Sequence, residues 1–239
     1  MKKSSIFKSL FFLIVILFVS TINISSANAA DCSSVTLKYK SKGECVKQLQ
    51  TLLKSRGFYS LSIDGDFGVG TANAVLNYQR ARHIGDDAIV GSITWKALKS
   101  TYMPENPIPA ECKNSGIRLC VSKAERKLRI HKDGVLIKTF DVRVGGFTTD
   151  INGNYRVHQS NEGNYSVYNK DPNPDSKRYG PGIMPWSVMF DPGMYVHYSA
   201  DFNSYGYSRA SHGCINIASK TDAKWIYDYT PLKSKVTVY

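Results

Sequence analysis

The sequence lacks a hydrophobic run long enough to cross a membrane as a helix, since its longest unbroken apolar stretch is the ten residues from Leu10 to Val19. A transmembrane helix needs about 20 such residues. The stretch follows a basic start, MKKSSIFK, and precedes small residues at A-x-A spacing, Ala27 to Ala29. This order is typical of a cleavable secretory signal, so we expect residues 1–30 to be removed on export. A membrane anchor is the alternative.

Acidic residues are scarce: 19 Asp and Glu stand against 31 Lys and Arg, which gives a net charge of +12. Removing residues 1–30 takes away three lysines and no acidic residue, so the mature chain keeps a charge of +9. An exported basic protein is attracted to anionic wall polymers, phospholipid surfaces or nucleic acid. Nucleic acid is the least favoured partner, because the basic residues are scattered and no recognition motif accompanies them. A basic surface without a particular partner is the plain alternative.

Cysteine is also rare, with five residues in the chain. Cys32 and Cys45 lie close together, as do Cys112 and Cys120, and local pairing would give two disulfides in an oxidising compartment. Other connectivities stay open, although each would tie the two halves of the chain together or consume Cys214. With local pairing, Cys214 is the odd thiol, and an odd thiol in an exported protein needs a reason.

The first half of the chain has helical spacing, and its length of 239 residues leaves room for two domains. Apolar residues recur at intervals of three and four in two runs, Val46, Leu49, Leu52, Leu53 and Ala72, Val75, Leu76, Tyr78. Between the runs lies a glycine-rich turn over 62–70, followed by Thr71 as the expected N-cap, and a third short helix is expected at Thr94–Leu98. Asp64 and Asp66 in the turn lack the further ligands of a calcium loop, so a turn is favoured over a calcium site.

This half resembles the small three-helix peptidoglycan-binding module found on many cell-wall enzymes. The resemblance covers nearly all of residues 35–99 and rests on DGDFG at 64–68, T-x-x-A-V at 71–75 and G-x-x-TW at 91–95, in family order. It implies retention on the wall. Thr101–Ala110, with three prolines, is predicted to be a semi-stiff linker. We therefore expect a helical domain at 31–99, a linker at 100–111 and a second domain at 112–239.

The second half has the alternation typical of strands. Leu128 and Ile130 alternate with charged residues, Lys132–Gly134 is a hairpin turn, and apolar residues at 135, 137, 142 and 144 continue the pattern. Further strands are expected at Tyr155–His158, Tyr165–Tyr168 and Val236–Tyr239, and one late helix at Lys220–Tyr227. The predicted fold class is α+β in two domains, a small all-α three-helix bundle followed by a mostly β sandwich with one late helix.

The candidate chemistry lies near Cys214, which needs a base because a thiol with a pKa of ~8.5 is mostly protonated at neutral pH. Imidazole is suited to this role, and both His197 and His212 are in reach along the sequence. The residues alone do not choose between them. Gly213 indicates a tight turn that exposes the sulfur and leaves backbone N–H groups free to hold an oxyanion.

His197, thirteen further residues and then SHGCIN at 211–216 resemble the active-site signature of the L,D-transpeptidase catalytic domain. The resemblance extends over about residues 117–239. It implies that His197 is the general base of Cys214, that the backbone carbonyl of Tyr198 orients it, and that Ser211, His212 and Gly213 form the active-site loop. The N–H groups of residues 212–214 are then the candidate oxyanion donors. The gap between His197 and Ser211 is slightly short for the family, so the resemblance does not predict the form of the flap over the site.

The resemblance implies two acyl transfers, in which Cys214 takes a tetrapeptide stem as a thioester, releases D-alanine and passes the acyl group to the amine of a second stem. It also implies opening of a carbapenem ring by the thiol. No metal or organic cofactor is expected. Peptidoglycan is the expected partner, with membrane contact only during export, and the protein is expected to be a monomer in the periplasm or the external wall. Hydrolysis by an L,D-carboxypeptidase or cysteine amidase, and a non-catalytic wall-binding role, are the alternatives.

Four apolar residues precede His197 and are candidates for the wall of a donor-stem groove: Met184, Pro185, Trp186 and Tyr195. Burial in the core is an equally good interpretation of these side chains.

Overall fold

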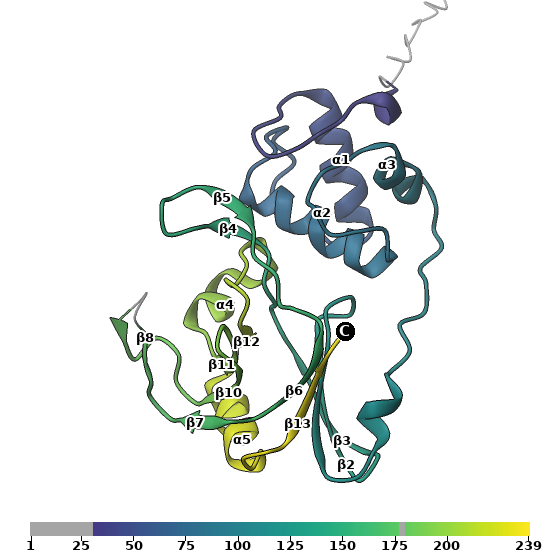
Figure 1. The fold of residues 1–239 in the computed structure, drawn as a ribbon. Coiled ribbons are helices and arrows are strands. Elements are labelled where there is room, and N and C mark those ends of the chain that lie inside the picture. Colours follow the sequence, from purple (N-terminus) through teal and green to yellow (C-terminus); the bar gives the residue numbers. More distant parts are fainter. Residues whose placement is uncertain (1–30, 177–179) are drawn as a thin grey trace, which may run out of the picture.

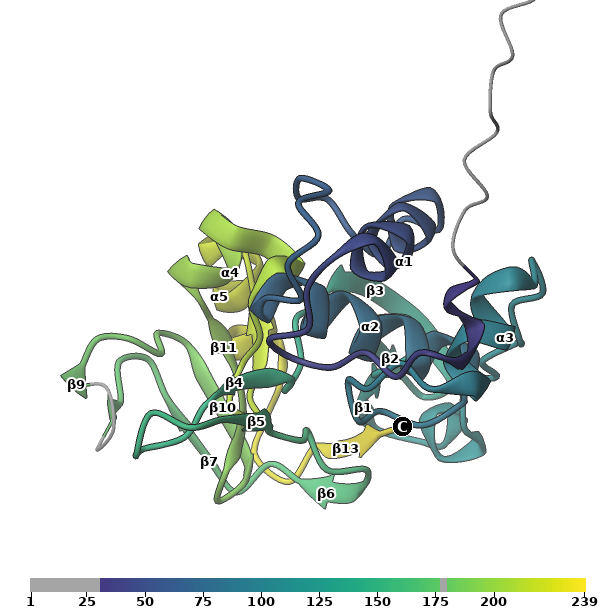
Figure 2. The same ribbon diagram turned by 90° about the horizontal axis from the view of Figure 1, so that it is seen from above.

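The computed structural model describes residues 31–176 and 180–239, and the predicted secretory signal lies outside these ranges. Within them, no helix combines the length and the apolar character that a membrane crossing requires. A helical N-terminal part precedes a mostly β part with one late helix, which confirms the predicted fold class. Figures 1 and 2 show the two parts packed side by side.

The helical part is a small bundle. Its elements are the 3-10 turn η1 (Cys32–Ser34) and the helices α1 (Glu44–Ser55), α2 (Val69–Arg82) and α3 (Ser92–Lys99). Their apolar residues share one core, in which Trp95, Tyr78 and Phe67 are the largest fully buried side chains. The helical periodicity of the sequence arises from this shared core.

The turn between α1 and α2 is held by a buried glutamine. Gln50 Nε2 donates to Asp64 Oδ1 at 2.7 Å, and Gln50 Oε1 accepts from the Gly65 N–H at 2.9 Å. The carboxylate of Asp64 therefore serves the turn. The expectation that Thr71 caps α2 is wrong, because the N-cap is Gly68 and Thr71 lies inside the first turn. There its hydroxyl accepts from Gln50 Nε2 at 3.2 Å, so burial against α1 has displaced the local capping role.

The larger sheet of the β part has five strands in the order β3-β2-β1-β13-β6. They are β1 (Ile117–Ser122), β2 (Lys127–Lys132), β3 (Val135–Asp141), β6 (Gly163–Ser166) and β13 (Lys235–Val238). The predicted hairpin is confirmed, since β2 and β3 pair antiparallel. On β1, Leu119 lies between Ile130 on one neighbour and Val236 on the other, and all three are buried. The alternation in sequence therefore builds one apolar face.

The smaller sheet has four strands in the order β12-β11-β10-β7. They are β7 (Asn169–Asp171), β10 (Ser187–Asp191), β11 (Met194–Tyr198) and β12 (Ile215–Ile217). Between β11 and β12 run the short helix α4 (Ala200–Tyr205) and the turn η3 (Gly206–Ser208), and α5 (Lys220–Tyr229) follows β12. Ala223 and Ile226 of α5 join residues of both sheets in one core.

Two short hairpins complete the β part. They are β4 (Phe147–Thr149) with β5 (Tyr155–Val157), and β8 (Asp175–Ser176) with β9 (Gly180–Pro181). Figure 1 shows that β4 and β5 lie beside the helical part. The strand expected at Tyr165–Tyr168 is displaced, because β6 ends at Ser166. There the chain leaves the larger sheet, and the N–H of Tyr168 donates instead to Met189 O on β10.

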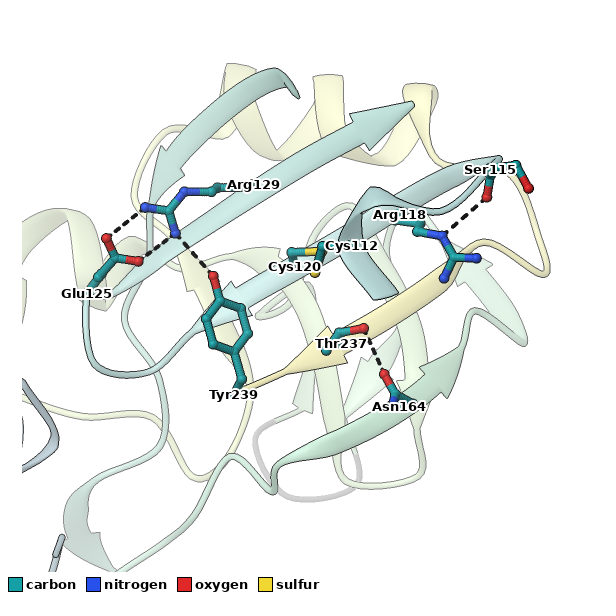
Figure 3. The surroundings of a disulfide bond; sticks show 9 residues. All are labelled: Cys112, Ser115, Arg118, Cys120, Glu125, Arg129, Asn164, Thr237 and Tyr239. Carbon is teal, nitrogen blue, oxygen red and sulfur yellow. Dashed lines mark hydrogen bonds and ion pairs between the residues drawn. A yellow bond between two sulfur atoms is a disulfide. The ribbon is translucent and has the colours of Figure 1, made fainter. Parts of the chain in front are cut away.

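Two disulfides are present, Cys32–Cys45 and Cys112–Cys120, which is the local pairing that the sequence favours. The second bond ties the turn η2 (Ala110–Lys113) to β1, the central strand of the larger sheet, as Figure 3 shows. On the same sheet, Arg129 bridges Glu125 and the hydroxyl of Tyr239.

Thiol counting tests this pairing. The denatured, unreduced mature chain should contain one free sulfhydryl, that of Cys214, and finding three or five would refute at least one bridge. Because each bond closes a short loop, its removal should destabilise the protein by about 2–3 kcal/mol at most. Denaturant unfolding of a Cys32→Ala/Cys45→Ala double variant measures this value, because replacing both cysteines leaves no unpaired thiol behind.

Candidate active site

The smaller sheet brings the candidate nucleophile and base together. β11 and β12 run parallel, and in their register His197 lies opposite Asn216. Cys214 comes just before β12, two residues from Asn216, so its side chain shares a face with those of Asn216 and His197. The alternate residues Ile215 and Ile217 point the other way, into the core. Thiol and imidazole therefore lie on the same face of the sheet, the one that looks away from the core, and the Cys214 Sγ is 4.0 Å from the Gly193 carbonyl oxygen.

Hydrogen bonds assign the tautomer of His197. Its Nδ1 is 2.6 Å from the Tyr198 carbonyl oxygen, which only accepts, so Nδ1 carries the proton. Its Nε2 is 3.0 Å from Asn216 Nδ2, which only donates, so Nε2 presents a lone pair. Arg143 fixes the direction of the Asn216 amide, because its Nε and Nη2 donate to Asn216 Oδ1 at 3.2 and 2.9 Å. The nitrogen that faces away from the backbone is thus the basic one.

Arg143 belongs to a polar cluster that the sequence did not reveal. Its guanidinium is buried and forms an ion pair with Asp201 of α4, with Nη1 2.7 Å from Oδ2. The same nitrogen lies 3.4 Å from the carbonyl oxygen of Gly206. Arg143 therefore links β12 to the segment that fills the short gap between His197 and Ser211. Asn216 was visible in the SHGCIN motif, whereas Arg143 stands 73 residues away without a local signal.

Hydrogen bonds within the loop that carries Cys214 hold its shape. Ser211 Oγ donates to the Cys214 carbonyl oxygen at 2.6 Å and accepts from the Gly213 N–H at 3.1 Å. Gly213 has a φ of +124°, and a side chain there would come within 3.0 Å of the Gln159 carbonyl oxygen. Only glycine fits this turn. Because the Gly213 N–H already donates to Ser211 Oγ, it is the least suited of the three expected oxyanion donors.

The side chain of His212 is engaged by the β4–β5 hairpin and its flank. Its Nε2 lies 2.7 Å from the Thr149 carbonyl oxygen on β4, so that nitrogen carries a proton. Its ring also contacts His158, with 5.0 Å between the ring centroids. His212 thus connects the loop to the β4–β5 hairpin. This geometry favours His197 over His212 as the candidate base.

Burial keeps both candidate groups neutral at rest. It lowers the pKa of His197 to about 4, even though the hydrogen bond that Nδ1 donates to the Tyr198 carbonyl acts in the opposite direction, and the positive charge of Arg143 lowers the pKa further. Burial also raises the pKa of the Cys214 thiol to about 11, and the backbone of Tyr195 offsets this only in part. The residue keeps part of its surface in contact with solvent. The resting pair is thus a thiol beside a neutral imidazole.

This resting state predicts an unusual titration. Thiolate formation at Cys214, followed by ultraviolet absorbance with Cys214→Ala as the blank, should have its midpoint near pH 11. Between pH 5 and 8, which lies above the pKa of His197 at about 4, no thiolate should appear. A midpoint below that of a free cysteine, ~8.5, would mean a thiolate–imidazolium pair and would contradict the assignment.

A cleft of about 720 Å³ lies over these residues and includes Cys214, His197 and Asn216 in its wall. Part of that wall comes from the helical part, from Leu61, Val69 and Gly70. The cleft is therefore composite, and the β part alone does not enclose it.

Of the four groove candidates, Met184 lines the cleft. The other three do not: Trp186 packs against the core and Tyr227, the carbonyl of Pro185 accepts from the backbone of Tyr198, and the Tyr195 hydroxyl donates to Pro192 O. The tryptophan and proline therefore support β11 from behind, as the core interpretation allowed.

Comparison with known proteins agrees with this architecture. The family described as L,D-transpeptidase catalytic domain matches residues 116–238, and the putative peptidoglycan binding domain matches residues 42–98. A spore cortex-lytic enzyme of Bacillus cereus is 35% identical over 101 residues, which are 41% of this chain and 38% of that protein. An N-acetylmuramoyl-L-alanine amidase of Mycobacterium tuberculosis is 41% identical over 56 residues, 23% of this chain and 14% of that protein. The chain thus spans well under half the length of these curated relatives.

A solved L,D-transpeptidase structure from Xylanimonas cellulosilytica is 28% identical, covers 85% of this chain and 97% of its own, and has a TM-score of 0.47. A β sandwich with a cysteine and a histidine on one sheet face, next to a bundle that matches the putative peptidoglycan binding domain, defines a class of two-part proteins with a candidate cysteine site. Within that class, this chain belongs to the L,D-transpeptidase catalytic domain family.

Proposed function

We propose that this protein is an L,D-transpeptidase of cell-wall biogenesis that crosslinks peptidoglycan stems through a thioester on Cys214. The observation that carries the proposal is the lone pair on His197 Nε2, presented on the same sheet face as the thiol in an open cleft. A neutral imidazole with an unprotonated nitrogen is a base that can take the proton of a thiol.

In the first transfer, His197 exchanges its Asn216 hydrogen bond for the proton of Cys214. The sulfur then bonds to the carbonyl carbon of the third residue of a tetrapeptide stem, the residue before the terminal D-alanine. The backbone amides of the loop stabilise the oxyanion. The bond to D-alanine breaks, and D-alanine leaves with the proton that His197 held, so a thioester remains.

In the second transfer, the side-chain amine of a diaminopimelate residue on another stem attacks the thioester. His197 accepts the proton that the amine loses, and the thiol of Cys214 is restored. The new amide is the crosslink. No step requires a metal or an organic cofactor.

The helical domain, which we place at residues 31–99, would hold the enzyme on the wall, and its match to the putative peptidoglycan binding domain supports this role. The positive charge of the chain favours the same anionic polymer. Export into a periplasm or an external wall, as a monomer, completes the proposal, and two disulfides fit an oxidising compartment.

Mass spectrometry tests the reaction class directly. The mature protein is mixed with purified disaccharide-tetrapeptide, beside Cys214→Ala. A dimer that lacks one D-alanine, absent with the variant, is the expected product. Loss of D-alanine without a dimer would replace crosslinking by L,D-carboxypeptidase activity. Unchanged substrate would exclude both crosslinking and carboxypeptidase activity and would leave a binding role. A dimer formed by Cys214→Ala would refute the assignment of Cys214 as the nucleophile.

A further inference from the structure

The β4–β5 hairpin lies between the catalytic loop and the helical domain. Its inner side holds the loop, because the Thr149 carbonyl accepts from His212 and the Gly146 N–H donates to the Ser211 carbonyl at 3.2 Å. After the hairpin, Ser160 Oγ donates to the carbonyl oxygen of Gly213 at 2.6 Å. The position of the loop around Cys214 is therefore set by the hairpin and the residues that flank it.

The outer side of the hairpin is held by helix α2. Asn73 binds the backbone of Phe147 at both ends, since its Oδ1 accepts from the Phe147 N–H at 2.8 Å and its Nδ2 donates to the Phe147 carbonyl at 3.1 Å. The side-chain amide thus takes the place of a neighbouring strand. Asn73 is 2% exposed, so these bonds form away from water and their loss leaves buried groups unpaired.

About two helical turns further on, Arg80 binds the chain on both sides of the hairpin. Its Nη1 donates to the Gly145 carbonyl oxygen at 2.7 Å, before β4, and its Nη2 donates to Gln159 Oε1 at 2.9 Å, after β5. Its Nε is paired with Asp86 of the helical domain at 3.2 Å. The two terminal nitrogens of the buried guanidinium therefore join the segments before β4 and after β5 to the helical domain.

Packing continues across the same junction. Phe147 belongs to the core of the helical domain, and its ring contacts that of Tyr39 with 5.1 Å between centroids. At Gly146, a side chain would come within 2.7 Å of Ala210 in the β part and within 2.8 Å of Asn73 Oδ1. Helix, hairpin and catalytic loop thus meet at one glycine, without room for a methyl group. This is the packing of one rigid unit rather than of two tethered domains.

We propose that helix α2 is a positioning element of the active site, in which Asn73 and Arg80 fix the hairpin and, through it, the loop that carries Cys214. The helical domain then has a second task besides wall retention, because it completes the geometry of acylation. The composite cleft, with Leu61, Val69 and Gly70 in its wall, is a separate observation in favour of this task. The inference rests on the proposed function only in taking acylation of Cys214 as the reaction.

Asn73→Ala in the mature full-length protein tests the proposal, with acylation of Cys214 by a carbapenem followed by mass spectrometry. Since misplacement by about 1 Å can lower a rate about 10²-fold, the acylation rate at saturation should fall by one to two orders of magnitude. Retention on purified peptidoglycan should stay at the wild-type level, because the bundle itself is intact. Arg80→Lys serves as the second variant if Asn73→Ala unfolds. It keeps the positive charge beside Asp86 but loses the forked guanidinium, so it too should acylate more slowly while its retention on peptidoglycan is unchanged.

Asn77→Ala is the matched control, because it makes the same change on the same helix at a half-exposed position. Wild-type acylation in both Asn73→Ala and Arg80→Lys would overturn the proposal, and so would an equal loss in Asn77→Ala. The carbapenem probe requires neither a natural donor nor an acceptor. If the wild type forms no muropeptide dimer while the variants still differ in acylation, the crosslinking function fails and the positioning role stands.

Discussion

His197→Gln is expected to lower the rate of Cys214 acylation at pH 7 by about 10²–10⁴-fold, the usual contribution of a general base. The reason is the resting protonation state. Burial holds the thiol pKa at about 11, so spontaneous ionisation leaves only a minute fraction of thiolate at neutral pH. Wild type avoids this limit by passing the proton to the lone pair on Nε2, and glutamine offers no such base.

The pH profile distinguishes loss of a base from loss of structure. In wild type, the rate should fall as the pH drops through about 4, where His197 becomes protonated and can no longer accept. In His197→Gln that limb should vanish, and the rate should rise tenfold per pH unit toward pH 11 as thiolate forms. His83→Asn, at the exposed end of α2, is the control histidine variant. A wild-type profile in His197→Gln would exclude His197 as the base.

The sequence predicts this pair because its signals are local. The SHGCIN motif supplies the loop, Gly213 marks a turn that requires a positive φ, and the resemblance to the family signature selects His197 over His212 as the base. The core of the bundle follows in the same way from spacing of three and four. These features depend on neighbours in the chain, so the residues themselves carry the information.

The rest depends on residues that are distant in the chain. Arg143 reaches Asn216 across 73 positions, and Asn73 reaches Phe147 across 74. Neither pair leaves a periodic or motif signal, because a buried polar residue is chosen by its partner rather than by its neighbours. The error at Thr71 has the same origin, since a tertiary contact with Gln50 overrode a local capping preference.

The shape of the junction also explains why a pattern analysis treats the two domains as separate. The linker after α3 is polar and rich in proline, which indicates independence. The contacts that join the domains come instead from α2 and from a hairpin whose strands are only three residues long. Strands this short give little alternation to detect. Their order comes from the helix on one side and the catalytic loop on the other.

Asn216→Asp is expected to abolish most activity at mildly acidic pH, below a His197 pKa raised to about 5–7, while it preserves the size and shape of the side chain. In wild type, the amide donates to the unprotonated Nε2 of His197, which burial keeps neutral. A carboxylate at that position accepts instead, so it favours a proton on Nε2 and raises the pKa of His197. An opposite charge at this distance shifts a pKa by about 1–3 units. Below this raised pKa, the base would carry a proton when the thiol needs to lose one.

The sign of this effect makes the test sharp. The acidic limb of the acylation rate should move upward from about 4, and activity should return as the pH rises and His197 loses its proton. Asn216→Ala, which removes the amide without adding charge, should move the limb less. Asn164→Asp adds the same charge outside the cleft, where Asn164 bonds to Thr237, and should leave the limb in place. An unmoved limb in Asn216→Asp would mean that the amide does not control the protonation of His197, and the tautomer assigned from the hydrogen bonds would be wrong.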